Sequence, residues 1–361
     1  MDNPDGILHY YLPTQLSKKR LDGYLAAGWF RTANMLFRAK ITCFDNDICS
    51  PINIRINLQE HVFSKRMGRL LRRNNAAFRY EIKKASMTPQ KEELFQVHQK
   101  RFRSFLCNSL EEFLVLTHRF DTYEINVYDQ EKLVAVSFFD EAHNGLMSLL
   151  GLFDPSYAAY SLGIYTMLLE MQHGQNTQRK WYYPGYVHEQ PSMYDYKLRL
   201  GKVEVYDWQK RRWLKNANPH QLPNWADELK KRTNELQKML RSVGLVCQQK
   251  VYLFFGWHYF NSMYDQLFRC PLMLLLPDGR VVAFDADLGQ YICVTLELYV
   301  PFRDIQMTLA PDFDMNLHYV DVMKVVEIQH QTANAQAMIA FVEQTVRQAQ
   351  SPYTLPVPNY L

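Results

Sequence analysis

Apolar and polar positions recur with two different periods along this chain, and the change of period predicts the order of its elements. Short apolar runs separated by turns predict three strands, at 124–128, 132–139 and 146–153. Apolar residues at helical spacing then predict a helix that begins after Ser161, a suitable N-cap. An aromatic run broken by Pro and Gly predicts a further strand at 181–186. The order is therefore strand, strand, strand, helix, strand.

The segments on either side of this block also mix helices and strands. Upstream, the pattern predicts a helix at 21–28, one strand at 30–38, an alternating strand at 52–58 and helices at 63–74, 88–105 and 109–118. Downstream, it predicts a helix at 225–242, strands at 251–257 and 292–300, a hairpin at 272–284 turning at Pro277-Asp278-Gly279, and a helix at 333–348. The expected fold class is α+β.

A basic segment at 208–218, bounded by Asn and Pro, predicts a boundary between domains. We expect an N-terminal unit at 1–85, a central unit at 86–217 and an α+β extension at 218–361. A chain of 361 residues with 47% hydrophobic residues can form two or three such cores.

Charge and cysteine usage limit the possible partners and compartments. The formal net charge is only +4, so a nucleic-acid surface must be a local basic patch. No run approaches ~20 apolar residues, and the N-terminus lacks the basic and apolar regions of a signal peptide. The six cysteines are scattered, which does not suggest a disulfide framework. We expect a soluble cytoplasmic protein without a membrane partner.

Several short phrases resemble one known family. They are Phe153-Asp154-Pro155, Ser161-Leu162-Gly163, Tyr183-x-Gly185-Tyr186 and Tyr196-Lys197. Their order and spacing resemble the arginyl-tRNA-protein transferases and the bacterial aspartate-glutamate leucyltransferases, over roughly residues 1–205. The resemblance implies a GNAT-like, acetyltransferase-type mixed sheet with flanking helices and a smaller N-terminal cysteine-motif region. It also implies transfer of Arg or Leu from charged tRNA to the N-terminal α-amine of proteins that start with Asp or Glu.

Such a transfer starts from an activated ester, so the enzyme must position an amine, remove its proton and stabilise an oxyanion. The resemblance assigns catalytic roles to Asp154, Tyr186 and Glu189. Asp154 is the expected orienting group or general base, and its other possible role is to cap the turn before Pro155. Tyr186 and Tyr196 are expected either to stack on the terminal adenine and line the aminoacyl pocket, or to belong to the core.

A basic helix is the predicted surface for the tRNA backbone. At helical pitch its cations share one face opposite an apolar face, which suits phosphates but is also typical of a solvated surface. The free N–H groups at Ser161 and Gly163 form a second candidate phosphate site. The predicted tRNA-binding residues are Lys65, Arg66, Arg69, Arg72, Arg73, Ser161, Gly163, Tyr196 and Lys197. Arg31, Arg66 or Lys197 is alternatively expected to bind the acceptor carboxylate.

A possible metal site lies near the N-terminus. The leucyl relatives carry C-x-x-C-x-x-C there, with a fourth cysteine upstream; this chain has Cys43, Asn46 and Cys49, with His9 upstream. Thiolates and imidazole bind zinc or iron, so His9, Cys43 and Cys49 are either ligands of zinc or an iron–sulfur cluster, or remnants of a lost site. Asp45 or Asp47 is the candidate fourth ligand. No cofactor is otherwise expected.

Departures from the family leave other functions open. Asn46 replaces a cysteine, Pro191 replaces a cysteine and Tyr194 replaces a methionine. A non-catalytic descendant that binds RNA or a protein partner is the first alternative. A CoA-dependent acyltransferase is the second, although its phosphate loop would need two or more glycines and this loop has only Gly163.

Overall fold

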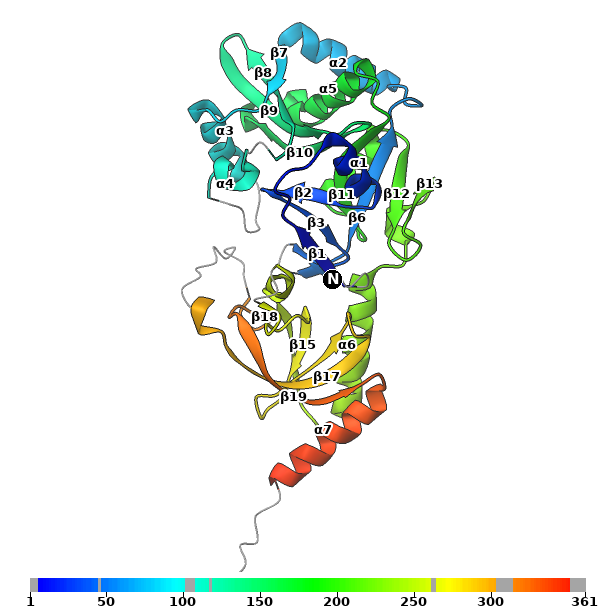
Figure 1. The fold of residues 1–361 in the computed structure, drawn as a ribbon, viewed down its shortest axis with the longest axis vertical. Coiled ribbons are helices and arrows are strands. Elements are labelled where there is room, and N and C mark those ends of the chain that lie inside the picture. The colour runs from blue at the N-terminus through cyan, green and yellow to red at the C-terminus, as the bar shows by residue number, and fades with distance from the viewer. Residues whose placement is uncertain are drawn as a thin grey trace, which may run out of the picture.

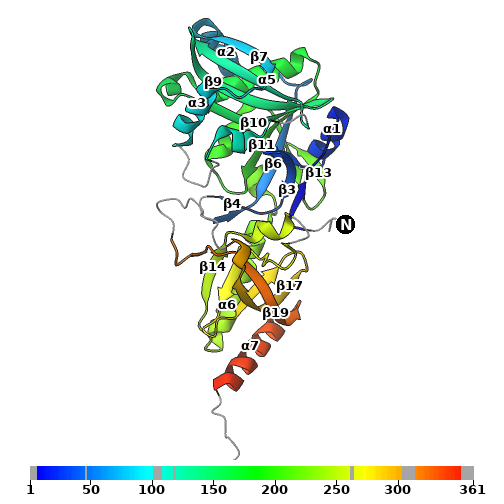
Figure 2. The same cartoon turned by 60° about the vertical axis from the view of Figure 1, so that its left-hand side comes forward.

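The computed structural model describes residues 6–44, 47–100, 108–116, 119–260, 264–302 and 314–350. Figures 1 and 2 show two bodies stacked along the long axis, with the N-terminal segment at the waist between them. The upper body holds the predicted strand, helix and strand block. The lower body is formed by the C-terminal extension.

An eight-stranded mixed sheet organises the upper body, in the order β13-β12-β6-β11-β10-β9-β8-β7. The strands are β6 (Pro51–Asn57), β7 (Arg79–Lys84), β8 (Thr122–Asp129), β9 (Lys132–Glu141), β10 (Gly145–Phe153), β11 (Trp181–His188), β12 (Val203–Asp207) and β13 (Arg212–Lys215). Because β6 and β7 both belong to it, the predicted units 1–85 and 86–217 share one sheet. The expected α+β class is confirmed.

The single parallel pair of this sheet opens towards its carboxyl end. Strands β10 and β11 pair only from Gly145 and Trp181 to Met147 and Tyr183. The register between β11 and β6 then shifts before Gly185, which has a φ of 95°. Glycine tolerates such a positive φ, so it allows the bend that separates the two strands. Ligands commonly bind beyond the carboxyl ends of parallel strands, where this opening lies.

Helices cover both faces of the sheet. Helices α2 (Lys65–Ala77) and α5 (Leu162–Asn176) pack on one face around Tyr165, Leu168 and Tyr182. The other face carries two cores. In one, α1 (Lys18–Ala26) and the three-stranded sheet of β1 (Leu8–Tyr11), β2 (Phe30–Thr32) and β3 (Met35–Ala39) pack against Met147 and Tyr183. In the other, α3 (Pro89–Gln99) and α4 (Leu110–Leu114) pack against β9 and β10.

The lower body is a six-stranded sheet with helices α6 (Trp225–Ser242) and α7 (Ala335–Gln350). The strands are β14 (Gln248–Tyr252), β15 (Leu272–Leu275), β16 (Val281–Asp285), β17 (Gln290–Leu298), β18 (His318–Tyr319) and β19 (Met323–Thr332). Its core also contains Ile7, Ile41 and Ile48 from the N-terminal segment. The short strands β4 (Thr42–Phe44) and β5 (Asp47–Cys49) therefore lie where the two bodies meet.

Two local predictions are wrong. Residues 30–38 form the hairpin β2–β3, because Ala33 takes a positive φ of 47° at the turn. Strand 251–257 ends at Tyr252 and is followed by a 3-10 helix at Phe255–Tyr259. The segment 208–218, predicted as a boundary, contains strand β13, and helix α6 of the lower body begins after it. Helix α5 begins after Ser161 as predicted; Ser161 stands at the N-cap position with a φ of 53° and makes no side-chain cap hydrogen bond.

Two predicted helices extend beyond the described residues. Helix 88–105 is observed to Gln99, and residues 101–107 are not described. Helix 109–118 is observed at Leu110–Leu114, and residues 117–118 are not described.

Candidate functional site

A cluster of aromatic rings surrounds one lysine at the carboxyl end of β11. Tyr186 and His188 come from β11 and Tyr194 from the following 3-10 helix at Met193–Leu200. The ring centroid of Tyr194 lies 5.7 Å from that of Tyr186 and 5.1 Å from that of His188, and Phe44 from β4 lies 4.9 Å from His188. We call Phe44, Tyr186, His188, Tyr194 and Lys197 the cage.

Lys197 lies buried in the cage. Its Nζ donates a hydrogen bond to the carbonyl oxygen of Tyr186 at 3.0 Å and lies 4.7 Å from the ring centroid of Tyr194. A Cβ on Gly185 would stand 3.3 Å from this Nζ, so the glycine leaves room for the amine. Burial lowers the pKa of Lys197 to about 7. The amine can therefore be neutral near physiological pH.

His188 presents an unused polar atom beside this amine. Its Nε2 is buried and has no hydrogen-bond partner among the described residues. Burial, reinforced by the nearby Lys197, lowers the pKa of His188 to about 4, so the ring is neutral at pH 7. Burial also raises the pKa of Tyr186 to about 12, which keeps its hydroxyl protonated. Because buried polar groups normally find partners, this Nε2 is available to bond a group that enters the cage.

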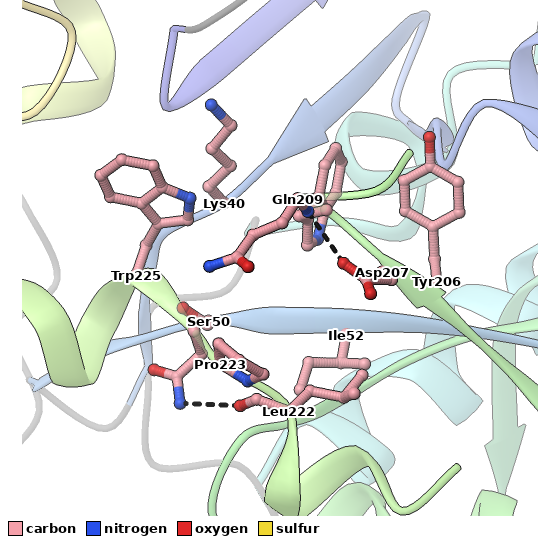
Figure 3. A pocket seen from close by; sticks show the side chains of 11 residues that line it. Lys40, Ser50, Ile52, Tyr206, Asp207, Gln209, Leu222, Pro223 and Trp225 are labelled. Atoms are coloured by element: carbon pink, nitrogen blue, oxygen red, sulfur yellow. Dashed lines mark hydrogen bonds between the residues drawn. The ribbon is translucent and has the colours of Figure 1, made fainter. Parts of the chain in front are cut away.

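The lower body is hydrogen-bonded to the edge of the cage. The backbone N–H of Ser50 donates to Glu189 Oε2 at 2.7 Å, and Ser50 Oγ accepts from the N–H of Ala226 at 3.0 Å. Burial raises the pKa of Glu189. Figure 3 shows Ser50 beside Trp225, in the first turn of α6. His220 adds a second link, because its Nδ1 lies 3.2 Å from the carbonyl oxygen of Glu189.

Asp154 occupies a turn and an ion pair. Its carboxylate accepts hydrogen bonds from the N–H and hydroxyl of Ser156 at 2.9 and 2.7 Å, and Lys132 Nζ lies 2.8 Å away. The bond from Lys132 and those from Ser156 lower the pKa of Asp154 to about 2. A carboxylate with so low a pKa is a weak base at pH 7. The geometry therefore favours the turn role, and the catalytic role stays a prediction.

We expect Asp154→Asn to retain transfer to within about threefold, because a general base would contribute about 10²- to 10⁴-fold. Loss of the Lys132 pair and of the cap should cost on the order of 1 kcal/mol of stability. Thermal unfolding and initial transfer rates measure the two effects. A folded variant that transfers at least tenfold slower would restore Asp154 as the base.

Arg31 is buried in a network of internal hydrogen bonds. Its guanidinium donates to Asp140 Oδ1 at 2.8 Å, to Thr122 Oγ1 at 2.8 Å and to the carbonyl oxygens of Ala33 and Leu114 at 2.7 and 2.6 Å. Its side chain is 1% exposed. These internal bonds favour a structural role for Arg31, and its acceptor-binding role stays a prediction.

The predicted tRNA surface is divided between two places. Lys65, Arg66, Arg69, Arg72 and Arg73 are all exposed on α2. The end of α2 reaches the start of α5, because Asn74 Nδ2 donates to the carbonyl oxygen of Tyr160 at 2.9 Å, next to Ser161 and Gly163. Lys197 and Tyr196 lie elsewhere: Lys197 is in the cage, and Tyr196 packs on the core of α5. The buried Lys197 therefore does not present its charge to a tRNA backbone.

The three predicted metal ligands do not fit a metal site. Cys43 and Cys49 lie on the paired strands β4 and β5, and burial raises the pKa of Cys49 to about 12 and that of Cys43 still further. His9 Nε2 lies 3.2 Å from the carbonyl oxygen of Gly6. Within the described ranges, no group of three His, Cys, Asp or Glu side chains is placed to hold a metal, and Asp45 and Asn46 are outside those ranges.

We expect purified protein to contain much less than one zinc or iron per chain. Elemental analysis measures the content, and thermal unfolding with and without a chelator measures its effect on stability. Structural metal contributes directly to folding free energy, so an unchanged midpoint supports a lost site. Stoichiometric metal together with a chelator-induced fall in the midpoint would show that His9, Cys43 and Cys49 rearrange to bind it.

The sequence analysis missed His188, Ser50 and His220. His188 follows Tyr186 by two residues on one strand, so the period of two predicts that both side chains share a face. That signal was available. No signal in the sequence relates Ser50 or His220 to Glu189, because those contacts join segments far apart in the chain.

Comparison with known proteins finds a family model that matches the central part of the chain. Residues 79–207, from the first residue of β7 to the last of β12, match the family model described as arginine-tRNA-protein transferase, C terminus. This segment carries the strands and helix that build most of the cage. The family resemblance predicted from the sequence is thus confirmed for this part of the chain.

Individual relatives match about half of the chain. The aspartate/glutamate leucyltransferase of Helicobacter hepaticus is 26% identical over 213 residues, which cover 57% of this chain and 86% of that protein. The protein of the same name from Shewanella putrefaciens is 29% identical over 168 residues, covering 45% and 68%. Among solved structures, L-PGS from Bacillus licheniformis matches with a TM-score of 0.30 and 10% identity, over 38% of this chain and 45% of that one. No helix of the described residues is long and apolar enough to cross a membrane.

Proposed function

We propose that this chain transfers Arg or Leu from charged tRNA to the N-terminal α-amine of proteins that start with Asp or Glu. The observation that carries the proposal is the cage: Tyr186 and Lys197, two residues of the family phrases, converge within the matched segment, past the paired part of β10 and β11. The acidic acceptor follows the name of the leucyltransferase relatives. Charged tRNA is made in the cytoplasm, where we place the reaction.

A GNAT-like fold is part of this proposal. The mixed sheet, its one parallel pair that opens towards the carboxyl end, and helix α5 leading from one of these strands to the other are the features that support it. An acyl group bound in that opening would lie beside the cage.

Lys197 is the proposed general base. The acceptor amine attacks the carbonyl carbon of the aminoacyl ester, a C–N bond forms, and neutral Lys197 accepts the proton that the amine loses. The C–O bond to the terminal ribose then breaks, and the ribose oxygen takes up this proton as it leaves. His188 Nε2 and the protonated Tyr186 hydroxyl are the groups of the cage that we propose bind the reacting groups. A base with a pKa near the working pH suits this step.

The test is a transfer assay with radiolabelled Leu-tRNA and Arg-tRNA, and peptides that begin with Asp, Glu or Lys. We expect label in Asp and Glu peptides from at least one donor, and none in N-acetylated Asp peptide, which lacks the attacking amine. Transfer of neither amino acid would overturn the proposal. Binding of tRNA without transfer would then identify an RNA-binding descendant, and labelling from acetyl-CoA would identify a CoA-dependent enzyme.

The basic face of α2 is proposed to bind the tRNA backbone. Each phosphate contact contributes roughly 0.7 to 0.9 to the slope of log affinity against log salt. We therefore expect Arg69→Ala with Arg72→Ala to lower this slope by roughly 1.4 to 1.8, measured by filter binding over a range of salt concentrations. Wild-type affinity and slope in the double variant would show that this helix is ordinary solvated surface.

A further inference from the structure

A second group of cations stands on the hairpin of β12 and β13. Lys210, Arg211, Arg212 and Lys215 are all exposed, with the side chains of Lys210 and Lys215 at 59% and 66% exposure. This hairpin belongs to the basic segment that the sequence suggested was only a domain boundary. We call these four residues the basic hairpin.

The two carboxylates that pair with hairpin lysines, Asp207 and Glu204, also make shorter bonds to other groups. Asp207 Oδ1 accepts from the N–H groups of Gln209 and Lys210 at 2.9 and 3.0 Å, and Glu204 is bound to Arg55 at 2.7 Å. The ion pairs from Lys210 to Asp207 and from Lys215 to Glu204 are longer, at 3.6 and 3.8 Å. The four cations are exposed and these two carboxylates are mostly buried, so the electrostatic potential at the surface of the hairpin is positive.

The hairpin is held firmly on the sheet. The guanidinium of Arg55 lies between two tryptophans, 3.6 Å from the ring centroid of Trp181 and 4.4 Å from that of Trp213. Trp213 Nε1 also donates to the carbonyl oxygen of Ala26 at 2.8 Å. The backbone that carries these cations is therefore ordered before a ligand binds, so mainly the side chains lose conformational entropy on binding.

The turn of the hairpin lies at the same end of the sheet as the cage. Trp208 Nε1 donates to the carbonyl oxygen of Pro51 at 3.3 Å, and Pro51 pairs with His188 in the sheet. Figure 3 shows Asp207 and Gln209 around the same small cavity as Ser50. The backbone N–H of Ser50 is bound to the Glu189 carboxylate, so the hairpin turn and the cage border one region.

We propose that the basic hairpin binds the phosphate backbone at the acceptor end of the donor tRNA. The inference rests on the proposed function, because a terminal ester held in the cage places the adjoining nucleotides near this end of the sheet. Lys and Arg on an edge strand also discourage pairing with other sheets. That role requires charge at the edge but does not require the hairpin to contact RNA.

The first test compares two matched triple variants. Lys210→Ala, Arg212→Ala and Lys215→Ala remove two lysines and one arginine from the hairpin; Lys231→Ala, Lys238→Ala and Arg241→Ala remove the same charges from exposed positions on α6. The probe is one deacylated tRNA, measured by filter binding over a range of salt concentrations, with thermal unfolding as the folding control. We expect the hairpin variant to bind at least about tenfold more weakly, with a salt slope lower by roughly 2 to 3.

If the hairpin variant binds tRNA as tightly as wild type, this inference is overturned; the proposed function stays intact, provided that wild type transfers the amino acid. If the hairpin and α6 variants both bind more weakly than wild type and to the same extent, the inference is also overturned, because the loss would reflect total charge alone. If wild type neither binds tRNA nor transfers an amino acid, the proposed function and the inference fail together.

The second test locates the contact. A photo-crosslinker attached to Arg212→Cys should react with nucleotides of the acceptor arm, whereas the same label on Lys238→Cys should not. Five other cysteines are described, four of them buried, so the labelled unsubstituted chain gives the background. Crosslinks confined to the anticodon arm, or none above that background, would overturn the placement.

Discussion

Replacing Lys197 with methionine should lower the rate of aminoacyl transfer by about 10²- to 10⁴-fold while the chain stays folded. Methionine keeps the length of the apolar stem but cannot accept a proton. The amine it replaces lies in the cage, 3.0 Å from the carbonyl oxygen of Tyr186, with its pKa lowered to about 7 by burial. Single-turnover assays with preformed aminoacyl-tRNA measure the change without a contribution from product release.

The pH dependence separates a base from a structural lysine. Free Lys197, with a pKa of about 7, and the free acceptor α-amine, with a pKa of about 7.7 to 8.0, must both be neutral for reaction. Below pH 7 log kcat/KM of the wild type should therefore rise with a slope of about 2, and that of Lys197→Met with a slope of about 1. His188 stays neutral over this range, because its pKa is lowered to about 4.

Lys197→Met should raise the stability of the protein at pH 7 although it lowers the activity. The lysine pKa is lowered from 10.5 to about 7 on folding, so the unfolded chain binds more protons between these values and wild-type stability rises with pH there. Lys197→Met removes this effect and should be more stable than wild type at pH 7, on the order of a few kcal/mol. Urea unfolding of both proteins at pH 7 and pH 9 measures the rise of wild-type stability with pH and the difference between the two proteins at pH 7.

Two outcomes would contradict the role of Lys197 as base. Near-normal transfer by folded Lys197→Met would assign the lysine to structure alone. Recovery of transfer by Lys197→Arg would indicate that a positive charge is what matters, because arginine remains protonated at these pH values.

The central strands were predictable because their pattern is local. Strands β8, β9 and β10 follow one another as antiparallel neighbours, and each carries its own apolar run and turn. The sheet order was not predictable in the same way. Strand β6 lies between β11 and β12, and the edge strands β7 and β13 are short and rich in charge, so their place depends on pairing with distant segments.

The site was predictable only in part for a related reason. The family phrases identified Tyr186 and Lys197, which the fold brings together. They did not show that Lys197 is buried, since that depends on the 3-10 helix Met193–Leu200 packing against β11. A lysine in a sequence suggests a solvated charge, and only the surrounding rings reveal a group that can lose its proton near pH 7.

The burial of Arg31, like that of Lys197, could not be predicted from the sequence. Replacement of Arg31 should have the largest effect on stability. Arg31→Met is expected to lower the free energy of unfolding by roughly 3 to 5 kcal/mol, because it leaves Asp140 buried without its charge partner. The Asp140 side chain is fully buried, and its Oδ1 would keep only the hydroxyl of Thr122. The carbonyl oxygens of Leu114 and Val115 would also lose the guanidinium that binds them.

A second substitution distinguishes loss of the ion pair from loss of packing. Arg31→Met combined with Asp140→Leu removes both charges, and apolar replacement of a whole buried pair is often neutral or stabilising. We therefore expect the double variant to recover most of the stability lost in Arg31→Met, as measured by urea unfolding. A double variant as unstable as Arg31→Met would show that packing and the carbonyl contacts dominate. At a temperature where Arg31→Met stays folded, the KM for an Asp-starting peptide should match wild type; a rise specific to acidic peptides would return Arg31 to the acceptor site.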